Sequence, residues 1–205
     1  MKIFNTPITI LTSTKLSMAS ALCHKVEESR ILNEDIKQLA TEICTNKAIL
    51  IKALEFDIND VEPKPHEMIA LTSNQLPPNT DYLPGTKYLK KSFSLKVSGS
   101  KELFTYRPSH IPPDYDISGR VTDDTVNIDF QTQIPSETLN EDQVKDLAAQ
   151  FKAAFQKMEE LRNEINKDVT ELNQFINKNV EELLEKRKEA LLSKQAIDKN
   201  LENFQ

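Results

Sequence analysis

The stretch that decides the fold lies at the C-terminal end and begins SETLNEDQVKDLAAQFKAAFQKMEELRNEINKDVTELNQF (residues 136–175). From Ser136 to Gln205 the chain contains neither proline nor glycine, the two residues that most often interrupt helices. Asn140 precedes two acids, which is the pattern of a helix N-cap followed by a first turn that suits the helix dipole. We therefore predict long helices over residues 136–205.

Apolar residues recur in this stretch with the seven-residue period of a coiled coil. One seam position carries Val144, Phe151, Met158, Ile165 and Leu172, and the other carries Leu147, Ala154, Leu161, Asp168 and Phe175. Nine of these ten residues are apolar, and Asp168 is the exception. Such a seam packs either within one chain or between chains, and we place packing within the chain ahead of self-association.

The register of the apolar stripe changes after Phe175. The next apolar residues are Ile176, Val180, Leu183, Leu184, Ala190 and Leu191. Together with Asp168, this shift predicts a break or bend between residues 163 and 179. The sequence thus predicts that residues 136–205 form a long helical hairpin or a coiled-coil region.

Residues 1–135 are expected to form an α+β domain that begins with two helices. The first is predicted over residues 14–30, after an Ile8-Thr9-Ile10 lead-in whose alternation is typical of a short strand or an extended segment. The second is predicted over residues 34–55, capped by Asn33 and kinked near Thr45.

The middle of the chain predicts a small antiparallel sheet. Residues 61–135 hold nine of the ten prolines and all three glycines, and strands are expected within residues 91–131. Residues 93–97 and 103–106 flank a Ser-Gly-Ser turn and predict one hairpin, and residues 117–121 and 126–130 predict a second strand pair. A further strand is expected around residues 68–71. The predicted fold class is α+β, with N-terminal helices, this sheet and long C-terminal helices.

Charge and hydropathy exclude some classes of partner. The net charge of −6 argues against nucleic acid or an anionic membrane as the main partner. No run reaches the ~18 apolar residues that a membrane span needs, and the N-terminus lacks the pattern of a secretion signal. Two cysteines do not make a disulfide framework. We expect a cytoplasmic protein with reduced thiols.

Few residues are placed to carry chemistry. Cys23-His24 and Cys44 offer three soft ligands, whereas a structural zinc site needs four. The histidines His24, His66 and His110 stand in unrelated contexts, and no Gly-x-Ser-x-Gly elbow accompanies them. We therefore expect neither a metal nor a cofactor.

A metal-dependent nuclease is the remaining enzymatic alternative. It would use Asp114 or Asp116 with a later acid–x–Lys motif to hold Mg²⁺. The strand that should carry this motif reads Asp129-Phe130-Gln131, without the lysine. We expect the chain not to be an enzyme, and any catalysis to reside in a downstream domain or a separate partner.

The last helix offers a second predicted interaction surface. Its apolar stripe lies beside the basic run Lys186-Arg187-Lys188, and no glycine stop follows it. We expect it to dock onto a partner. The residues predicted for this docking are Asn173, Arg187, Lys188, Leu191, Leu201 and Phe204.

Two stretches of the chain resemble a known family. Residues 102–109, ELFTYRPS, followed by Pro112-Pro113, are similar to an "LF…PS…PP" motif, and Asn173 with residues 187–192, RKEALL, resembles an "N…RrkLL" helix. Both motifs occur in the N-terminal region that precedes TIR-type or restriction-endonuclease-like effector domains in bacterial antiphage-type proteins. The stretch from Ile36 to Asp60 is also similar to an early helix of that region.

This resemblance implies a function without catalysis on this chain. We expect a regulatory, sensing or oligomerisation module of a bacterial antiviral defence effector, with protein as its partner. The effector domain would then belong to a longer chain or to a separate protein. The alternative is a generic coiled-coil scaffold or adaptor.

Overall fold

The computed structural model describes residues 2–65, 67–70, 87–112, 117–122, 124–131 and 140–202. Its contacts divide the chain into two compact units. The first contains residues 1–6 and 54–165, and the second contains residues 7–53 and 166–205. The boundary expected at residues 135/136 is therefore not the one that the contacts follow, because each unit combines N-terminal and C-terminal pieces of the chain.

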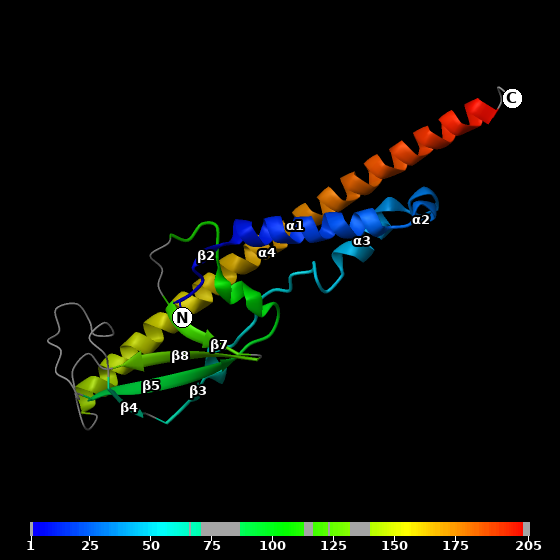
Figure 1. The fold of residues 1–205 in the computed structure, drawn as a ribbon. Helices are drawn as coiled ribbons and strands as arrows, with labels where there is room; N and C mark the ends of the chain where they lie inside the picture. Colours follow the sequence, from blue (N-terminus) through cyan, green and yellow to red (C-terminus); the bar gives the residue numbers. More distant parts are fainter. Residues whose placement is uncertain are drawn as a thin grey trace. The chain divides into compact units, whose positions relative to one another are not determined.

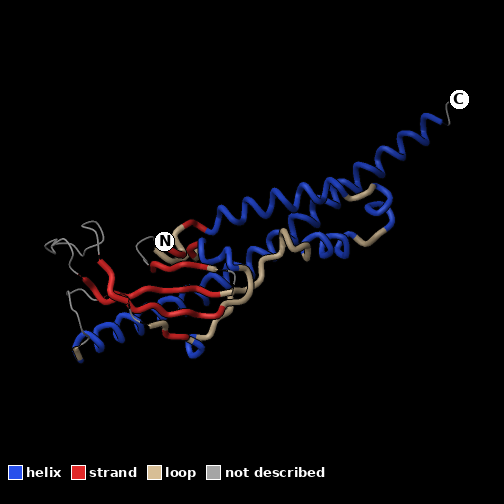
Figure 2. The backbone as a smooth tube through the Cα atoms, turned by 60° about the horizontal axis from the view of Figure 1, so that its bottom comes forward, coloured by secondary structure: helices blue, strands red, loops and turns tan. Residues whose placement is uncertain are grey.

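The α+β class is confirmed (Figures 1 and 2). The helices are α1 (Ile8–Lys25), α2 (Glu28–Asn33), α3 (Ile36–Cys44) and α4 (Glu141–Glu202), with short 3₁₀ turns η1 (Ile58–Asp60) and η3 (Lys101–Thr105). The strands are β1 (Lys2–Ile3), β2 (Thr6–Pro7), β3 (Glu62–Pro63), β4 (Glu67–Ala70), β5 (Lys87–Lys96), β6 (Tyr106–Arg107), β7 (Ile117–Val121) and β8 (Thr125–Gln131).

An antiparallel sheet forms the first unit, in the order β1-β7-β8-β5-β3, and β4 also pairs with β5. The long strand β5 is its centre, because β8 covers one edge while β4 and β3 share the other. The register places Phe93 opposite Ile128 and Leu95 opposite Val126, so one face of the sheet is apolar. An antiparallel sheet with one packed face shows this alternation.

The apolar face of the sheet packs on the first part of α4, drawn in yellow in Figure 1. The ring centroids of Phe93 and Phe151 lie 4.1 Å apart, and those of Phe151 and Phe155 lie 4.3 Å apart. Phe130 completes the group at 6.0 Å from Phe151. Tilted and edge-on aromatic pairs at these distances add to the free energy gained by burying the rings.

One of the two predicted hairpins is wrong and the other is confirmed. β7 and β8 pair with Val121 opposite Val126, as expected. Residues 101–105 form the 3₁₀ turn η3 instead of a strand beside β5. The cause lies at Ser98, which exchanges backbone hydrogen bonds with Glu55, and at Gly99, whose φ of 88° turns the chain away from the sheet. The strand expected around residues 68–71 is present as β4.

η3 supplies a second aromatic cluster to the first unit. Phe104 is fully buried, and its ring centroid lies 5.4 Å from that of Phe4 and 6.2 Å from that of Phe56. Arg162 of α4 covers the Phe56 ring, with its guanidinium carbon 4.9 Å from the centroid. The same guanidinium donates to the Phe56 carbonyl oxygen at 2.6 Å, which fixes α4 to this part of the backbone.

The N-terminal helix differs from the prediction at both ends. α1 starts at Ile8, directly after Pro7, so the predicted lead-in strand is the first turn of a helix. The helix predicted over residues 14–30 ends at Lys25, and residues 28–33 form the separate helix α2. The buried residues of α1 follow the helical period: Ile8, Leu11, Lys15, Ala19 and Cys23. Alternating Ile8 and Ile10 suggested a strand, but Ile8 and Leu11 share a buried helical face.

The helix predicted over residues 34–55 is shorter than expected. α3 begins after Asp35, whose carboxylate accepts from the Gln38 amide at 3.0 Å, so Asp35 is the N-cap in place of Asn33. It ends at Cys44, where the Asn46 side chain accepts from the Ala48 amide at 2.9 Å and turns the chain. The predicted kink near Thr45 is thus the end of the helix. The apolar residues that follow are buried in non-helical backbone.

Helix α4 is continuous from Glu141 to Glu202. Asn140 is its N-cap as predicted, because its side chain accepts from the Gln143 amide at 2.9 Å while the Gln143 side chain accepts from the Asn140 amide at 3.1 Å. The break predicted between residues 163 and 179 does not occur, and neither does a helical hairpin. α4 contributes residues 141–165 to the first unit and residues 166–202 to the second.

The buried stripe of α4 does not keep the predicted heptad period. Val144 is 50% exposed and Phe175 is 49% exposed, although both occupy seam positions. A straight helix of 3.6 residues per turn drifts by about 20° per heptad, so the ends of a five-repeat seam rotate out of the buried face. The buried residues are Leu147, Phe155, Met158, Leu161, Ile165, Asp168, Val169, Leu172, Ile176, Val180 and Leu184.

Alanine substitutions of the adjacent residues Phe175 and Ile176 test which face of α4 is buried. Ile176→Ala should lower the free energy of unfolding by about 2–5 kcal/mol, because Ile176 is 1% exposed. Phe175→Ala should change it by no more than about 0.5 kcal/mol. Urea unfolding followed by circular dichroism measures both. A larger loss for Phe175→Ala than for Ile176→Ala would mean that the heptad seam, and not the straight-helix stripe, is the buried one.

Candidate functional site

In the second unit, side chains of α1 and α4 hold the non-helical segment that follows α3. The Asn173 carboxamide makes two hydrogen bonds to Ile51: its Nδ2 donates to the carbonyl oxygen at 2.8 Å, and its Oδ1 accepts from the amide at 3.4 Å. The buried Lys15 donates to the Ala48 carbonyl oxygen at 3.0 Å. Backbone outside a helix or sheet needs such partners when it is buried.

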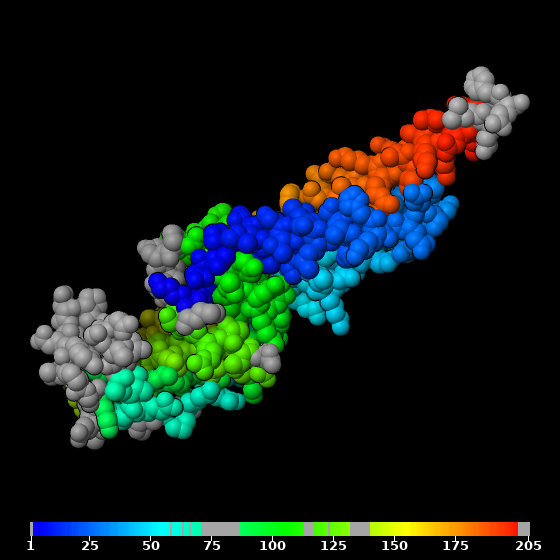
Figure 3. Space-filling model, viewed as in Figure 1, coloured from blue at the N-terminus to red at the C-terminus, as the bar shows by residue number. Residues whose placement is uncertain are grey.

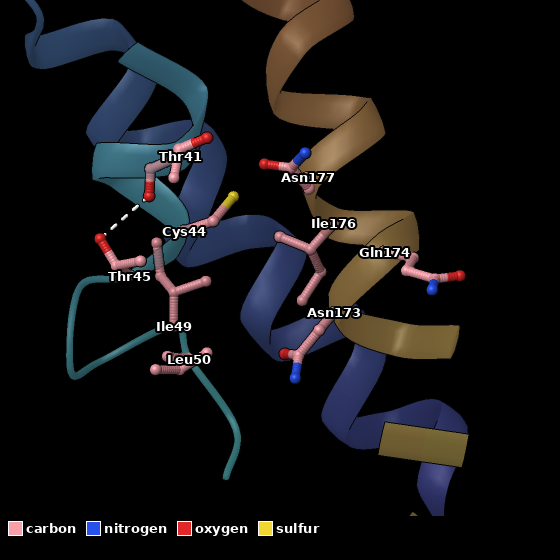
Figure 4. A pocket seen from close by; sticks show the side chains of 9 residues that line it. All are labelled: Thr41, Cys44, Thr45, Ile49, Leu50, Asn173, Gln174, Ile176 and Asn177. Carbon is pink, nitrogen blue, oxygen red and sulfur yellow. Dashed lines mark hydrogen bonds between the residues drawn. The ribbon is translucent and has the colours of Figure 1, made fainter. Parts of the chain in front are cut away.

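A groove of about 310 Å³ lies beside this contact, between α3 with its following segment and α4. Its lining is uncharged and consists of Thr41, Cys44, Thr45, Ile49, Leu50, Asn173, Gln174, Ile176 and Asn177. Figure 4 shows the Cys44 thiol and the Asn177 side chain facing the groove from opposite sides, with Ile176 below them, whereas Gln174 points away. We take this groove as the candidate functional site of the second unit.

The thiol in the groove is protonated at neutral pH. Burial, together with the neighbouring Cys23 thiol, raises the pKa of Cys44 to about 11. Burial also raises the pKa of Cys23, against the lowering effect of the Arg187 guanidinium. A thiol reacts as a nucleophile only in its thiolate form, so both side chains are poor nucleophiles here.

Arg187 of α4 caps the C-terminal end of α1. Its guanidinium donates to the carbonyl oxygen of Cys23, and to that of Val26 at 3.3 Å. The last carbonyls of a helix have no partner within the helix and carry partial negative charge, which suits a cation. The adjacent Lys188 reaches the Glu34 carbonyl oxygen, after α2, at 3.5 Å.

The predicted docking residues therefore have different places in the structure. Asn173, Arg187 and Lys188 already bind backbone groups of this chain. Leu191 is half-buried, the Leu201 side chain is not among the described features, and Phe204 lies outside the described residues. Five of the predicted seam residues are buried within the chain: Met158, Leu161 and Ile165 completely, and Leu147 and Leu172 nearly so. Phe151 is half-buried. The two exposed ones are Val144 and Phe175.

The residues considered for catalysis are not brought together. Asp114, Asp116 and His66 lie outside the described residues, while His24 and His110 are exposed. Asp129 accepts from Ser92 at 2.7 Å and lies 3.0 Å from the Lys90 ammonium. Burial acts to raise the pKa of Asp129, but these hydrogen bonds outweigh it and the net shift is downward.

The described residues contain no group of three or more His, Cys, Asp or Glu side chains that could hold a metal ion. None of their helices is both long enough and apolar enough to cross a membrane. The expectation that Cys23 and Cys44 bind no metal stays a prediction.

Comparison with protein-family models, with curated proteins and with solved structures gives no match. The resemblance to the region that precedes antiphage effector domains therefore stays a prediction. The groove and Asn177 were not predicted from the sequence. The available signal was the pair Asn173 and Asn177, two carboxamides one helical turn apart beside the apolar residues Leu172 and Ile176.

The raised pKa of Cys44 predicts slow alkylation of the folded protein. At pH 7.5 the thiolate fraction should be roughly a hundredfold smaller than for an ordinary thiol, because each pH unit below the pKa lowers it tenfold. N-ethylmaleimide modification, followed by mass spectrometry of the Cys44 peptide, should be correspondingly slow and should recover in urea. Equal rates in folded and unfolded protein would contradict this.

The same shift predicts a loss of stability in alkali. The native thiol keeps its proton while the unfolded thiol, with a pKa near 9.0, loses it, so the stabilisation is present below pH 9 and disappears as the pH rises through about 11. Cys44→Ala should flatten the dependence of the free energy of unfolding on pH between 9 and 11. An unchanged slope in that variant would assign the dependence to other groups.

Removal of the Arg187 cap should destabilise the second unit. Arg187→Gln should lower the free energy of unfolding by about 1.5–3 kcal/mol, the usual range for hydrogen bonds that involve a charged group. Lys186→Gln, an exposed neighbour, is the control and should have little effect. Equal effects of the two variants in urea unfolding would show that the cap does not contribute.

Proposed function

We propose that this protein is a non-catalytic regulatory module that acts through protein–protein contacts, and that α4 is the element through which its two units influence each other. The observation that carries the proposal is the continuity of α4. A single helix supplies the buried stripe of the first unit through Met158 and Leu161, and that of the second through Ile176 and Val180. A change of packing in one unit therefore acts on a helix that the other unit also needs.

The polar side chains on α4 bind backbone groups of this chain, which supports a function in protein binding over one in catalysis. Arg162, Asn173 and Arg187, which could bind charged or polar ligands, hold backbone groups of this chain. Both thiols are held in their protonated forms. The three polar side chains of α4 therefore stabilise the fold.

The C-terminal part of α4 is available to a partner. Leu192 is 50% exposed and Ile197 is 59% exposed, and the surrounding residues from Glu189 to Asn200 are exposed except Leu191. Figure 3 shows this part of the helix, in orange to red, with an open surface on the side viewed. A contiguous exposed apolar patch marks a surface that binds other proteins, and we propose that Leu192 and Ile197 belong to such a patch.

Within this class we propose the regulation of a bacterial antiviral effector, on the strength of the resemblance of residues 102–109 and 187–192. Leu103 and Phe104 are buried and Arg187 caps α1, so the residues that carry the resemblance are ones that hold the fold together. A shared motif of this kind supports a shared architecture. The effector itself would be a TIR-type or restriction-endonuclease-like domain in the same chain or in a partner.

The coupling through α4 is tested by amide hydrogen exchange on the full chain. Met158→Ala removes a fully buried side chain from the first unit, and its effect should extend along the helix. We expect faster exchange at amides 166–184 of the second unit as well as at amides 141–165. Val144→Ala, at a half-exposed position of the same helix, should leave both segments unchanged.

An insertion serves as the second arm of this experiment. Gly-Pro-Gly placed between Ile165 and Asn166 should interrupt the helix, and Met158→Ala should then no longer affect amides 166–184. Wild-type exchange at amides 166–184 in the uninterrupted Met158→Ala protein would overturn the proposed coupling.

The defence assignment is tested in cells. The expected result is that genes beside this one encode a TIR-type or restriction-endonuclease-like protein, and that the pair lowers phage plating when expressed together. Met158→Ala should weaken that protection. Normal plating with the pair would favour the generic scaffold.

A further inference from the structure

We propose that the groove beside Asn177 binds an extended, uncharged peptide segment of a protein partner, and that the Asn177 carboxamide recognises the backbone of that segment. This inference takes from the proposed function only that the partner is a protein. The site is separate from the exposed end of α4 and from the coupling between the units.

The mode of recognition is already present one helical turn away. Asn173 binds non-helical backbone at Ile51 with both ends of its carboxamide, donating to the carbonyl oxygen and accepting from the amide. A peptide unit offers one donor and one acceptor, and a carboxamide can bind both at once because its oxygen accepts while its nitrogen donates. This part of α4 thus binds a non-helical segment as the edge of a sheet would.

Asn177 presents the same chemistry to the groove. It follows Asn173 by four residues, so the two side chains lie on the same side of the helix. Figure 4 shows its carboxamide at the groove wall, across from the Cys44 side chain. Within the part of the chain that the structure describes, the half-buried Asn177 carboxamide makes no hydrogen bond, whereas the carboxamides of Asn173 and Asn179 both do.

The lining restricts the chemistry of the occupant. Ile49, Leu50 and Ile176 supply apolar surface, and no lining residue is charged. The hydroxyls of Thr41 and Thr45 donate to carbonyl oxygens of their own helix, so their donors are used and only their acceptor lone pairs are left for a ligand. An apolar side chain would therefore fill the groove while the backbone that carries it meets Asn177.

The groove is continuous with the existing contact, which is why we infer an extended peptide as the occupant. Asn173, which binds Ile51, also lines the groove, as do Ile49 and Leu50, the residues just before Ile51. A second extended segment would lie next to the one that the chain already supplies, and successive turns of α4 would hold the two.

The probe is a library of random heptapeptides displayed on phage and selected against the full chain. We expect apolar, uncharged peptides to be enriched. The affinity of a synthetic copy of an enriched peptide, measured by calorimetry, should fall about tenfold for Asn177→Ala, as the loss of two hydrogen bonds predicts. Asn179→Ala is the matched control, because Asn179 bonds to Phe175 of its own helix, and it should bind as the wild type does.

Two further readouts locate the peptide. Bound peptide should slow the alkylation of Cys44 by N-ethylmaleimide at pH 9, because Cys44 lines the groove. Asn177→Asp, which keeps the size of the side chain but replaces its donor, should weaken binding as Asn177→Ala does.

Three results would overturn the inference: no enriched peptide, equal affinities for the wild type and Asn177→Ala, or a Cys44 alkylation rate that the peptide does not change. None of these results affects the hydrogen-exchange experiment with Met158→Ala. Peptide binding in the groove can therefore be disproved while the coupling through α4 is confirmed, and the coupling can be disproved while peptide binding is confirmed.

Discussion

The rest of the structure depends on the burial of one apolar stripe along α4. Met158, Leu161 and Ile165 in the first unit, and Ile176 and Leu184 in the second, are at most 1% exposed. Burial of each such side chain contributes about 1.5–3 kcal/mol to the free energy of folding. An isolated helix with a polar average composition would not be stable by propensity alone, and tertiary packing of one face is what holds it.

The sequence predicted the helix, its N-cap and the approximate stripe because these depend on local pattern. Asn140 with the acids behind it, and 70 residues without proline or glycine, are readable without a structure. The heptad seam was correct in its middle and wrong at both ends, at Val144 and Phe175, because a pattern of period 3.5 and a helix of period 3.6 separate over several turns. Asp168 indicated a break, yet it is accommodated in the continuous helix.

Tertiary contacts decided the features that the sequence could not predict. Residues 103–106 were predicted as a strand, but the hydrogen bonds between Ser98 and Glu55 and the positive φ of Gly99 direct residues 101–105 into a 3₁₀ turn, and only Tyr106 lies in a strand, β6. In the same way, the apolar residues after Thr45 continue a helical pattern although Asn46 ends the helix. The apolar pattern after Thr45 predicted correctly that these residues would be buried. It could not predict their backbone conformation, because the core that they join determines it.

The sequence also could not predict which groups the polar side chains of α4 bind, because those partners are set by the tertiary fold. Arg162, Asn173 and Arg187 each bind backbone that lacks a ladder partner: a carbonyl at Phe56, a whole peptide edge at Ile51 and the carbonyls that end α1. Each residue type matches its target, since a guanidinium only donates and a carboxamide both donates and accepts. Asn177 repeats the chemistry of Asn173 at the next turn. The two turns differ in what lies opposite the helix: backbone of this chain, at Ile51, bonds to the Asn173 carboxamide, and none of the described residues bonds to the Asn177 carboxamide.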